Sequence, residues 1–320
     1  MQKMTNREII EGRIYQHDLV LKTVANATSP NFGKPFIQGT LEIATDEDAL
    51  NVVKIHYTYV AEKTKNGGNN KTFTDLKKVI DENKTWINVG KDAAQLISVT
   101  PSIALNDFYI NDNGEERAVA EKRNEGGFVN FITSLNEDVH QRTKFTTDMV
   151  ITAVRHIDAN PERHIDADYC ELQGAIFNFR NDLLPVTFVI RDINGMAYFE
   201  NEEITPSTPL FTQVWGEIIN TSKVEKQEVA SAFGNAAVRE TRRTVKEYLV
   251  TGARKIPYDF GDENVLTAQD LVKAQQDRET HLAEVKKKQD EYKAQKAAQA
   301  AAPVTSTPSA ATVAAGQFNF

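Results

Sequence analysis

Two short segments, far apart in the chain, share an order of residues that is typical of a bent β-strand. Residues 37–43 read IQGTLEI and residues 172–178 read LQGAIFN, so that hydrophobe, Gln, Gly, small residue and hydrophobe recur in one order. A glycine inside a strand indicates a sharp bend, because a residue without Cβ relieves crowding there. We therefore predict one small β-module built twice; the alternative is a chance recurrence of Gln-Gly in strands.

The first half of the chain alternates strand-like and turn-rich segments. Strand patterns occupy residues 12–24, 36–45 and 50–60, after a short polar lead, and residues 53–59 alternate apolar and polar side chains. Residues 72–83 have helical spacing, with Thr74 as the expected cap. Residues 95–135 are β-rich again, and Asn113-Gly114 favours a type I′ hairpin turn. This is the element order of an OB-fold, a five-stranded Greek-key barrel.

The second half repeats much of this order. Strand patterns occupy residues 145–157, 170–179, 184–192 and 209–222. Residues 193–203 are interpreted as a turn and a strand, so no clear helix is expected between the third and fourth strands. Residues 245–250 fit either a closing strand or a helix. The fold class that we predict is mainly β, with two OB-fold-like small barrels, a C-terminal helix and a disordered tail.

The last part of the chain changes in composition. Residues 267–302 contain good helix formers without Gly or Pro, and Thr267 is a suitable cap. The segment APVTSTPSAATVAAG is of low complexity and typical of disorder, and the chain then ends in GQFNF. We predict OB-like modules at residues 1–140 and 141–260, a charged helix at 261–302, and a disordered tail with an aromatic tip at 303–320.

Composition narrows the class of protein. No run approaches 18 apolar residues and the first residues lack a secretory pattern, so we expect no membrane association. The single cysteine, Cys170, suits a reducing compartment and predicts a cytoplasmic protein. The net charge of −8 argues against a generally basic surface but leaves room for a local basic groove.

Signals for catalysis are weak. The chain has no Gly-rich phosphate loop and no Gly-x-Ser-x-Gly elbow, so we expect a protein that is not an enzyme and needs no cofactor. The segment HIDANPERHIDADYCE would hold a divalent cation only if the loop folds back on itself. We interpret it as a solvated loop and expect no metal site.

Signals for binding single-stranded nucleic acid are better, since such a site needs aromatic faces for the bases and cations for the phosphates. The second half also has a basic run from Arg239 to Lys255, which either follows phosphates or is a solvated face. Tyr57, Tyr59, Phe177 and Phe179 fit either stacking or the core. The candidate binding residues are Arg13, Tyr15, Lys34, Lys54, His56, Tyr57, Tyr59, Lys63, Lys65 and Lys71 in the first module, and Arg155, Phe177, Phe179, Arg180, Trp215, Arg239, Arg242, Arg243 and Lys246 in the second.

The organisation resembles that of bacteriophage single-stranded DNA-binding proteins. The resemblance is carried by FIQGTLEI with LNVVKIHYTYV, by the echo ELQGAIFNF, by the linker APVTSTPSAAT and by the tip GQFNF. It implies a protein that coats or protects exposed strands during phage replication or recombination. It also implies that Phe318 and Phe320 dock replication or recombination proteins, although this tip lacks the usual acidic side chains; the alternative is an inert terminus.

Two other functions stay open. The chain could be a phage structural or assembly protein that uses its barrels as an oligomer platform, since fold alone does not fix function. It could also bind protein or carbohydrate through the same barrel face. The sequence leaves the preference for DNA or RNA, the oligomeric state and the binding face undecided.

Overall fold

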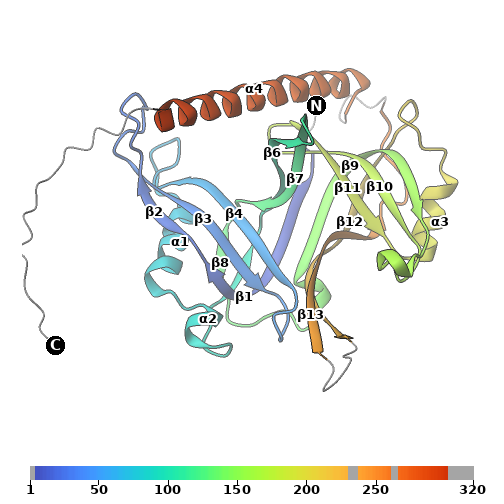
Figure 1. Cartoon of the computed structure of the whole chain (residues 1–320), viewed down its shortest axis with the longest axis horizontal. Coiled ribbons are helices and arrows are strands. Elements are labelled where there is room, and N and C mark those ends of the chain that lie inside the picture. The colour runs from blue at the N-terminus through green and yellow to red at the C-terminus, as the bar shows by residue number, and fades with distance from the viewer. Residues whose placement is uncertain (1–3, 230–236, 261–265, 302–320) are drawn as a thin grey trace, which may run out of the picture.

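The computed structural model describes residues 4–229, 237–260 and 266–301, with the backbone alone at 222–229, 237–243 and 298–301. The described residues form thirteen strands, and eleven of them pair into two adjoining rings (Figure 1). The other two, at residues 20–23 and 129–131, each pair with one strand of the first ring. The C-terminal helix α4 spans Ala268–Ala301. Among the residues that the structure describes, no helix is long and apolar enough to cross a membrane.

The first ring runs from β1 through β3, β4 and β7 to β6, and closes through β5, which pairs back with β1. β5 and β6 are two parts of one path, separated at Thr100 and Pro101. The pair β4–β7 is parallel and the others are antiparallel. The elements are β1 (Asn6–His17), β2 (Val20–Thr23), β3 (Pro35–Ala44), β4 (Val52–Ala61), α1 (Lys71–Glu82), α2 (Trp86–Val89), β5 (Leu96–Val99), β6 (Ser102–Asp112), β7 (Glu115–Glu125) and β8 (Val129–Phe131).

The second ring runs from β9 through β10, β11, β13 and β12 back to β9. Its third and fifth strands, β11 and β13, are again the parallel pair. A helix follows the third strand in both rings, so both have the element order of an OB-fold and the predicted fold class is confirmed. The elements are η1 (Val139–Gln141), β9 (Thr143–Ile157), η2 (Pro161–Arg163), β10 (Tyr169–Phe177), β11 (Leu183–Ile190), α3 (Ile193–Asn201), β12 (Leu210–Val229) and β13 (Ala237–Ala253).

The two repeated glycines occupy matching places. Gly39 lies in β3 and Gly174 in β10, the second strand of each ring, and each stands at a shift in register. A Cβ at Gly39 would lie 2.7 Å from the Asp18 carbonyl oxygen, and one at Gly174 would lie 2.0 Å from that of Val150. Gly39 also has a φ of 133°. The predicted relief of crowding by a residue without Cβ is therefore confirmed at both glycines.

Helix α3 differs from the sequence prediction, which placed a turn and a strand there. The Asp192 side chain accepts a hydrogen bond from the Gly195 amide at 2.7 Å and so caps the helix. Met196 and Phe199, three residues apart, are buried. The pair Asn194-Gly195, which is typical of a turn, lies within the first turn of this helix.

Other local predictions had mixed outcomes. The hairpin at Asn113-Gly114 is confirmed, with positive φ at both residues. Asn70, rather than Thr74, caps α1, because its side chain accepts the Thr72 amide. Strand β1 begins within the expected polar lead, and residues 245–250 form part of a strand.

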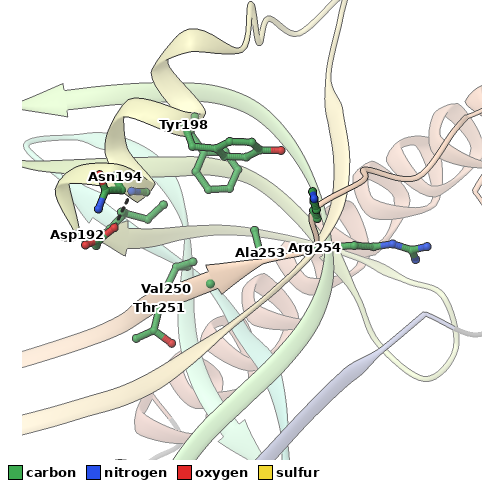
Figure 2. A pocket seen from close by; sticks show the side chains of 12 residues that line it. Asp192, Asn194, Tyr198, Val250, Thr251, Ala253 and Arg254 are labelled. Carbon is green, nitrogen blue, oxygen red and sulfur yellow. Dashed lines mark hydrogen bonds between the residues drawn. The ribbon is translucent and has the colours of Figure 1, made fainter.

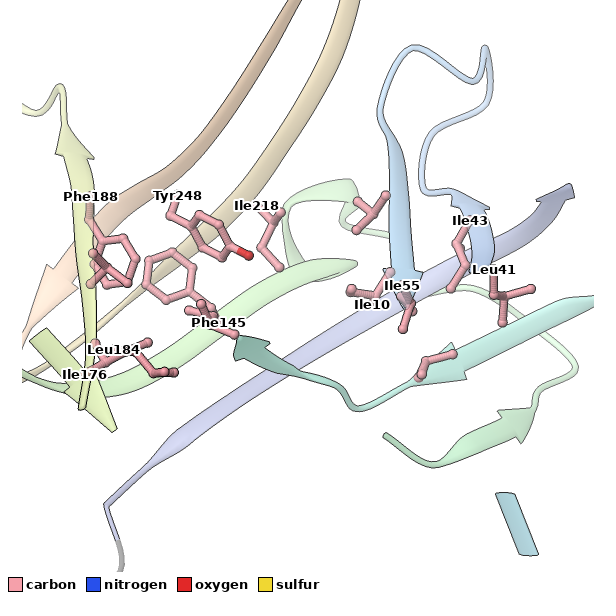
Figure 3. Packing of buried hydrophobic residues seen from close by; sticks show 14 of the residues in the cluster. Ile10, Leu41, Ile43, Ile55, Phe145, Ile176, Leu184, Phe188, Ile218 and Tyr248 are labelled. Carbon is pink, nitrogen blue, oxygen red and sulfur yellow. The ribbon is translucent and has the colours of Figure 1, made fainter. Parts of the chain in front are cut away.

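One hydrophobic core is shared by the two rings. It extends from Ile10 and Ile55 in the first ring to Phe188 and Tyr248 in the second (Figure 3). β1 pairs with β9 along Asn6–Ile10, which joins the rings edge to edge. An aromatic cluster of Phe145, Phe188 and Tyr248, with ring centroids 5.1–5.5 Å apart, fills the second ring near this junction.

Helix α4 lies along one side of the two rings (Figure 1). Its Arg278 forms two hydrogen bonds with the Asp107 carboxylate of β6, and Gln289 pairs with the Tyr109 backbone. The beginning of the helix packs on a smaller apolar cluster that includes Phe177 and Phe211. The predicted helix is thus confirmed, and it is fixed by polar contacts rather than by a continuous apolar face.

Candidate nucleic-acid interface

A groove of about 250 Å³ lies where the two rings meet, and we call it the inter-barrel groove. One wall is formed by β4 and β7 of the first ring, and the other by β12 and β13 of the second. Its lining residues are Val53, Lys54, His56, Glu121, Lys122, Arg123, Asn124, Ile218, Ile219, Asn220, Lys246, Glu247 and Tyr248.

The turn between β3 and β4 holds the two walls together. Asn51 Nδ2 donates to the Ile218 carbonyl at 3.3 Å, and the Asn220 amide donates to Asn51 Oδ1 at 2.7 Å. The Asn220 side chain also donates to the Val52 carbonyl. These contacts fix β12 against β4, so the spacing of the groove is set by backbone as well as by side chains.

Basic side chains enter the groove from both walls. Lys54, Lys122 and Arg123 come from the first ring and Lys246 from the second, while Glu121 and Glu247 also line the space. The Lys54 side chain is 47% exposed and Lys246 is exposed, so both can reach a ligand. Two strands more than 180 residues apart in the chain therefore supply cations to one surface.

Ion pairs with neighbouring carboxylates offset part of this positive charge. Lys54 Nζ lies 2.7 Å from Glu42, and Arg123 lies 3.1 Å from Glu125. Burial lowers the pKa of His56, and the cations Arg123 and Lys54 lower it further. A neutral imidazole beside these cations can accept or donate a hydrogen bond without adding charge to the groove.

Lys122 forms the inner part of the groove. Its Nζ donates to the Thr187 carbonyl of β11 at 2.5 Å and lies over the rings of Phe188 and Tyr248. Burial lowers the pKa of this lysine, although Glu171 and Glu247 oppose the shift. Lys122 therefore holds the β6–β7 hairpin of the first ring against the second ring.

An exposed aromatic pair stands further along β4. Tyr59 is 45% exposed and stacks on Phe36, with ring centroids 4.7 Å apart and planes at 29°. Lys22 of β2 is opposite Phe36 in the strand register. The five residue steps from Lys54 to Tyr59 span about 17 Å of strand, so cations and an aromatic face follow each other along one strand.

Two predicted stacking residues belong to the core. Tyr57 is 2% exposed and Phe177 is fully buried, so neither ring presents a face to a base. The alternation around Tyr57 directs this ring inward, and Lys54 and His56 point outward instead. Burial raises the pKa of the Tyr57 hydroxyl, in keeping with its place in the core.

Other predicted residues lie in separate places. Arg13 pairs with Glu47 at 3.2 Å, and Tyr15 packs edge-on against Trp86 of α2. Phe179 is 70% exposed in the β10–β11 turn beneath the Arg180 guanidinium. Lys34 and Lys63 form hydrogen bonds with Asn31 and Asn69, and Lys65 lies in an exposed turn. Lys71 forms an ion pair with Asp75, and Arg155 lies 3.9 Å from Glu171. Trp215 packs against Gly252.

Several predicted residues fall outside the described part of the chain. The side chains of Arg239, Arg242 and Arg243 do so, although their backbone belongs to β13 and leads toward Lys246. Phe318 and Phe320 of the tip, and the predicted disordered tail, lie outside it entirely.

A second cavity, of about 360 Å³, lies between α3 and the end of β13 (Figure 2). Ile190, Tyr198, Phe199 and Val250 give it largely apolar walls. The side chain of Arg254 points away from Tyr198 (Figure 2), and its guanidinium lies over the Tyr258 ring. The Asp192 carboxylate faces this space, which makes it unsuitable for a phosphate.

Sequence reasoning missed Lys122, Arg123 and Phe36. The search for aromatic side chains on strands that selected Tyr59 could also have selected Phe36, because Phe36 stands near the beginning of a strand with exposed neighbours. Lys122 and Arg123 stand in a mixed run, EKRNE, whose formal charges balance. Only the pairing of β7 with β4 brings them beside Lys54.

The fold defines a protein of the OB-fold class with two joined rings and a basic groove between them. The sequence matches the YorF family over residues 9–288, and the protein belongs to this family. A comparison with curated proteins found no match. Among solved structures, the chain is similar to a deletion mutant of the single-stranded DNA-binding protein from Thermus aquaticus, with 11% identity, a TM-score of 0.44, and coverage of 82% of this chain and 100% of that one.

Proposed function

We propose that the protein is a non-enzymatic binder of single-stranded DNA and that the strand passes along the inter-barrel groove. The observation that carries this proposal is the convergence of Lys54, Lys122 and Arg123 from one ring with Lys246 from the other. Phosphates respond to such a local potential even when the whole protein is acidic.

The aromatic pair supports the same path. OB-folds bind oligonucleotides across their second and third strands, which in the first ring are β3 and β4. Phe36 and Tyr59 lie on these two strands and offer a partly exposed ring surface for a base. Stacking tolerates any base, so we expect binding with little preference for sequence. Protection of exposed strands in bacteriophage replication or recombination extends the proposal through the sequence resemblance.

The test is fluorescence anisotropy of a labelled oligothymidine with the full chain at low salt. We expect Lys54→Glu combined with Lys246→Glu to weaken binding at least tenfold, because two phosphate contacts become repulsive. Lys287→Glu combined with Lys296→Glu is the matched control, since it changes the charge equally at exposed positions of α4.

Two results would overturn the proposal. One is the absence of binding by the wild-type chain at low salt, and a stable symmetric oligomer in that case would favour an assembly platform. The other is an equal loss of affinity in the groove variant and the α4 variant, which would mean that net charge alone, rather than the groove, attracts the strand.

A further inference from the structure

Three potential metal ligands from three elements of the second ring meet at a place outside the inter-barrel groove. His156 lies near the end of β9, Cys170 lies opposite it in register near the beginning of β10, and Glu200 belongs to α3. Nδ1 of His156 lies 2.6 Å from Glu200 Oε1 and 3.8 Å from Cys170 Sγ, and Sγ lies 3.3 Å from the same carboxylate oxygen. The three ligand atoms thus form a small triangle.

The size of this triangle fits one ion. Zinc binds Cys sulfur at about 2.3 Å and His nitrogen or carboxylate oxygen at about 2.0–2.2 Å, so a tetrahedral site has edges of roughly 3.3–3.6 Å. The two edges that include Sγ are close to this range. The third edge must widen by roughly 0.7 Å, and the Glu200 side chain, 39% exposed at the surface, is free to make this movement.

The other side of the histidine ring has the partners that metal-binding histidines usually have. Nε2 of His156 lies 3.7 Å from Asp158 and 3.9 Å from Asp168. Histidine ligands commonly direct their second nitrogen to a carboxylate, which orients the ring and makes it a stronger ligand. These aspartates also belong to the segment HIDANPERHIDADYCE, which therefore does fold back on itself.

We propose that His156, Cys170 and Glu200 bind a single Zn²⁺ ion, with water from the solvent as the fourth ligand. The mixed sulfur, nitrogen and carboxylate set suits zinc rather than magnesium or calcium. Without metal, burial raises the pKa of the Cys170 thiol to about 12, and the thiol donates to Glu200. On binding, the sulfur–proton bond is replaced by a sulfur–zinc bond and the proton goes to solvent.

The ion would clamp the helix to the barrel. Glu200 stands near the end of α3, whereas His156 and Cys170 stand on paired strands. A bond from each to one ion would fix α3 over the end of the ring. This role is independent of strand binding, because the inter-barrel groove shares no residue with the cluster.

The test uses the full chain freed of metal by a chelator and titrated with Co²⁺ and then Zn²⁺. We expect one equivalent of Co²⁺ to give a sulfur-to-cobalt charge-transfer band, Zn²⁺ to displace it, and Zn²⁺ to raise Tm by a few degrees. Cys170→Ser should abolish the band, and Glu200→Gln should weaken binding at least tenfold. His164→Ala, in the same loop but outside the triangle, should bind like the wild-type chain.

Circular dichroism of each metal-free variant shows whether it is folded. The absence of the band in the folded wild-type chain would overturn the proposal. So would Zn²⁺ binding that is unchanged in both Cys170→Ser and Glu200→Gln, because the ion would then occupy another site.

Discussion

At the scale of single residues, the most consequential group is a carboxyl buried where the rings join. Glu8 of β1 is fully buried, and its Oε1 lies 3.2 Å from the Tyr248 hydroxyl, which lies 2.6 Å from Asn124 Oδ1. Burial raises the pKa of Glu8 to about 8. One hydroxyl hydrogen cannot serve both acceptors, so a protonated Glu8 that donates to Tyr248 completes the chain of hydrogen bonds.

This carboxyl makes the free energy of unfolding depend on pH. Between its unfolded value of 4.5 and its folded value of about 8, the native state holds the proton and the unfolded chain does not. The free energy of unfolding therefore has its full contribution from neutral Glu8 below about pH 4.5. This contribution is lost as pH rises to about 8, which lowers the free energy of unfolding by roughly 4–5 kcal/mol. We expect Glu8→Gln, which cannot ionise, to become progressively more stable than wild type across this range.

The measurement is the difference in Tm between Glu8→Gln and the wild-type chain from pH 5 to pH 9. Taking the difference cancels the titration of the other groups. Glu62→Gln, at an exposed position, is the control and should show a flat difference. A flat difference for Glu8→Gln as well would mean that the buried carboxyl is ionised or solvated in the native state.

Residue-level prediction succeeded where one rule decides the outcome. Gly39 and Gly174 could be placed from sequence because only a residue without Cβ tolerates such close backbone approach. Tyr57 and Tyr59 could not be told apart, since both lie at odd positions of one strand. Their burial differs because the register shifts between them: Ile37 of β3 pairs with Val60 and Gly39 with Tyr57, so β4 carries one extra residue there and Tyr59 no longer shares the buried face of Tyr57.

At the scale of elements, the two helices of the second half show what local pattern can and cannot predict. Helix α4 follows from helix formers without Gly or Pro, and Thr267 caps it by accepting the Asp270 amide. Helix α3 is short and opens with a pair typical of turns, so it depends on the burial of Met196 and Phe199. Because the sequence did not predict helix α3, it could not predict that Glu200 lies beside Cys170.

The most buried ion pair between helix α4 and the first ring joins Arg278 to Asp107. The side chains of Arg278 and Asp107 are 11% and 4% exposed, and His281 adds a contact to the same carboxylate. We expect Arg278→Ala to leave Asp107 buried without its partner and to destabilise the docked helix by about 3 kcal/mol. Amide hydrogen exchange should therefore speed up throughout the middle of α4, with the strands of both rings unaffected.

Lys288→Ala is the control for this change. Lys288 belongs to the same helix but makes only an exposed contact with Glu284 at 4.0 Å. Its exchange pattern should match wild type. Unchanged protection of α4 in Arg278→Ala would show that the other contacts of the helix, such as those of Gln289 with Tyr109 and of Lys286 with Glu116, hold it without this ion pair.

At the scale of the whole molecule, the contacts that join the two rings lead us to expect that they unfold together. They share a continuous core, the β1–β9 pairing and the hydrogen bonds among Glu8, Asn124 and Tyr248. The sequence predicted two modules of similar order but could not predict this union. The contacts that form it, such as Lys122 with Thr187, join residues with no local pattern in common.

The two tryptophans report on the two rings separately, which allows this coupling to be measured. Trp86 in α2 packs on Tyr15 of the first ring, and Trp215 in β12 packs on Gly252 of the second. In the single-tryptophan variants Trp86→Phe and Trp215→Phe, we expect fluorescence to give the same urea midpoint as circular dichroism measured on the same variant. A fluorescence transition that precedes the circular dichroism transition in either variant would mean that the ring around the remaining tryptophan unfolds alone. Adding Glu8→Gln at pH 8 should then raise both fluorescence midpoints together, because the carboxyl lies at the junction that the rings share.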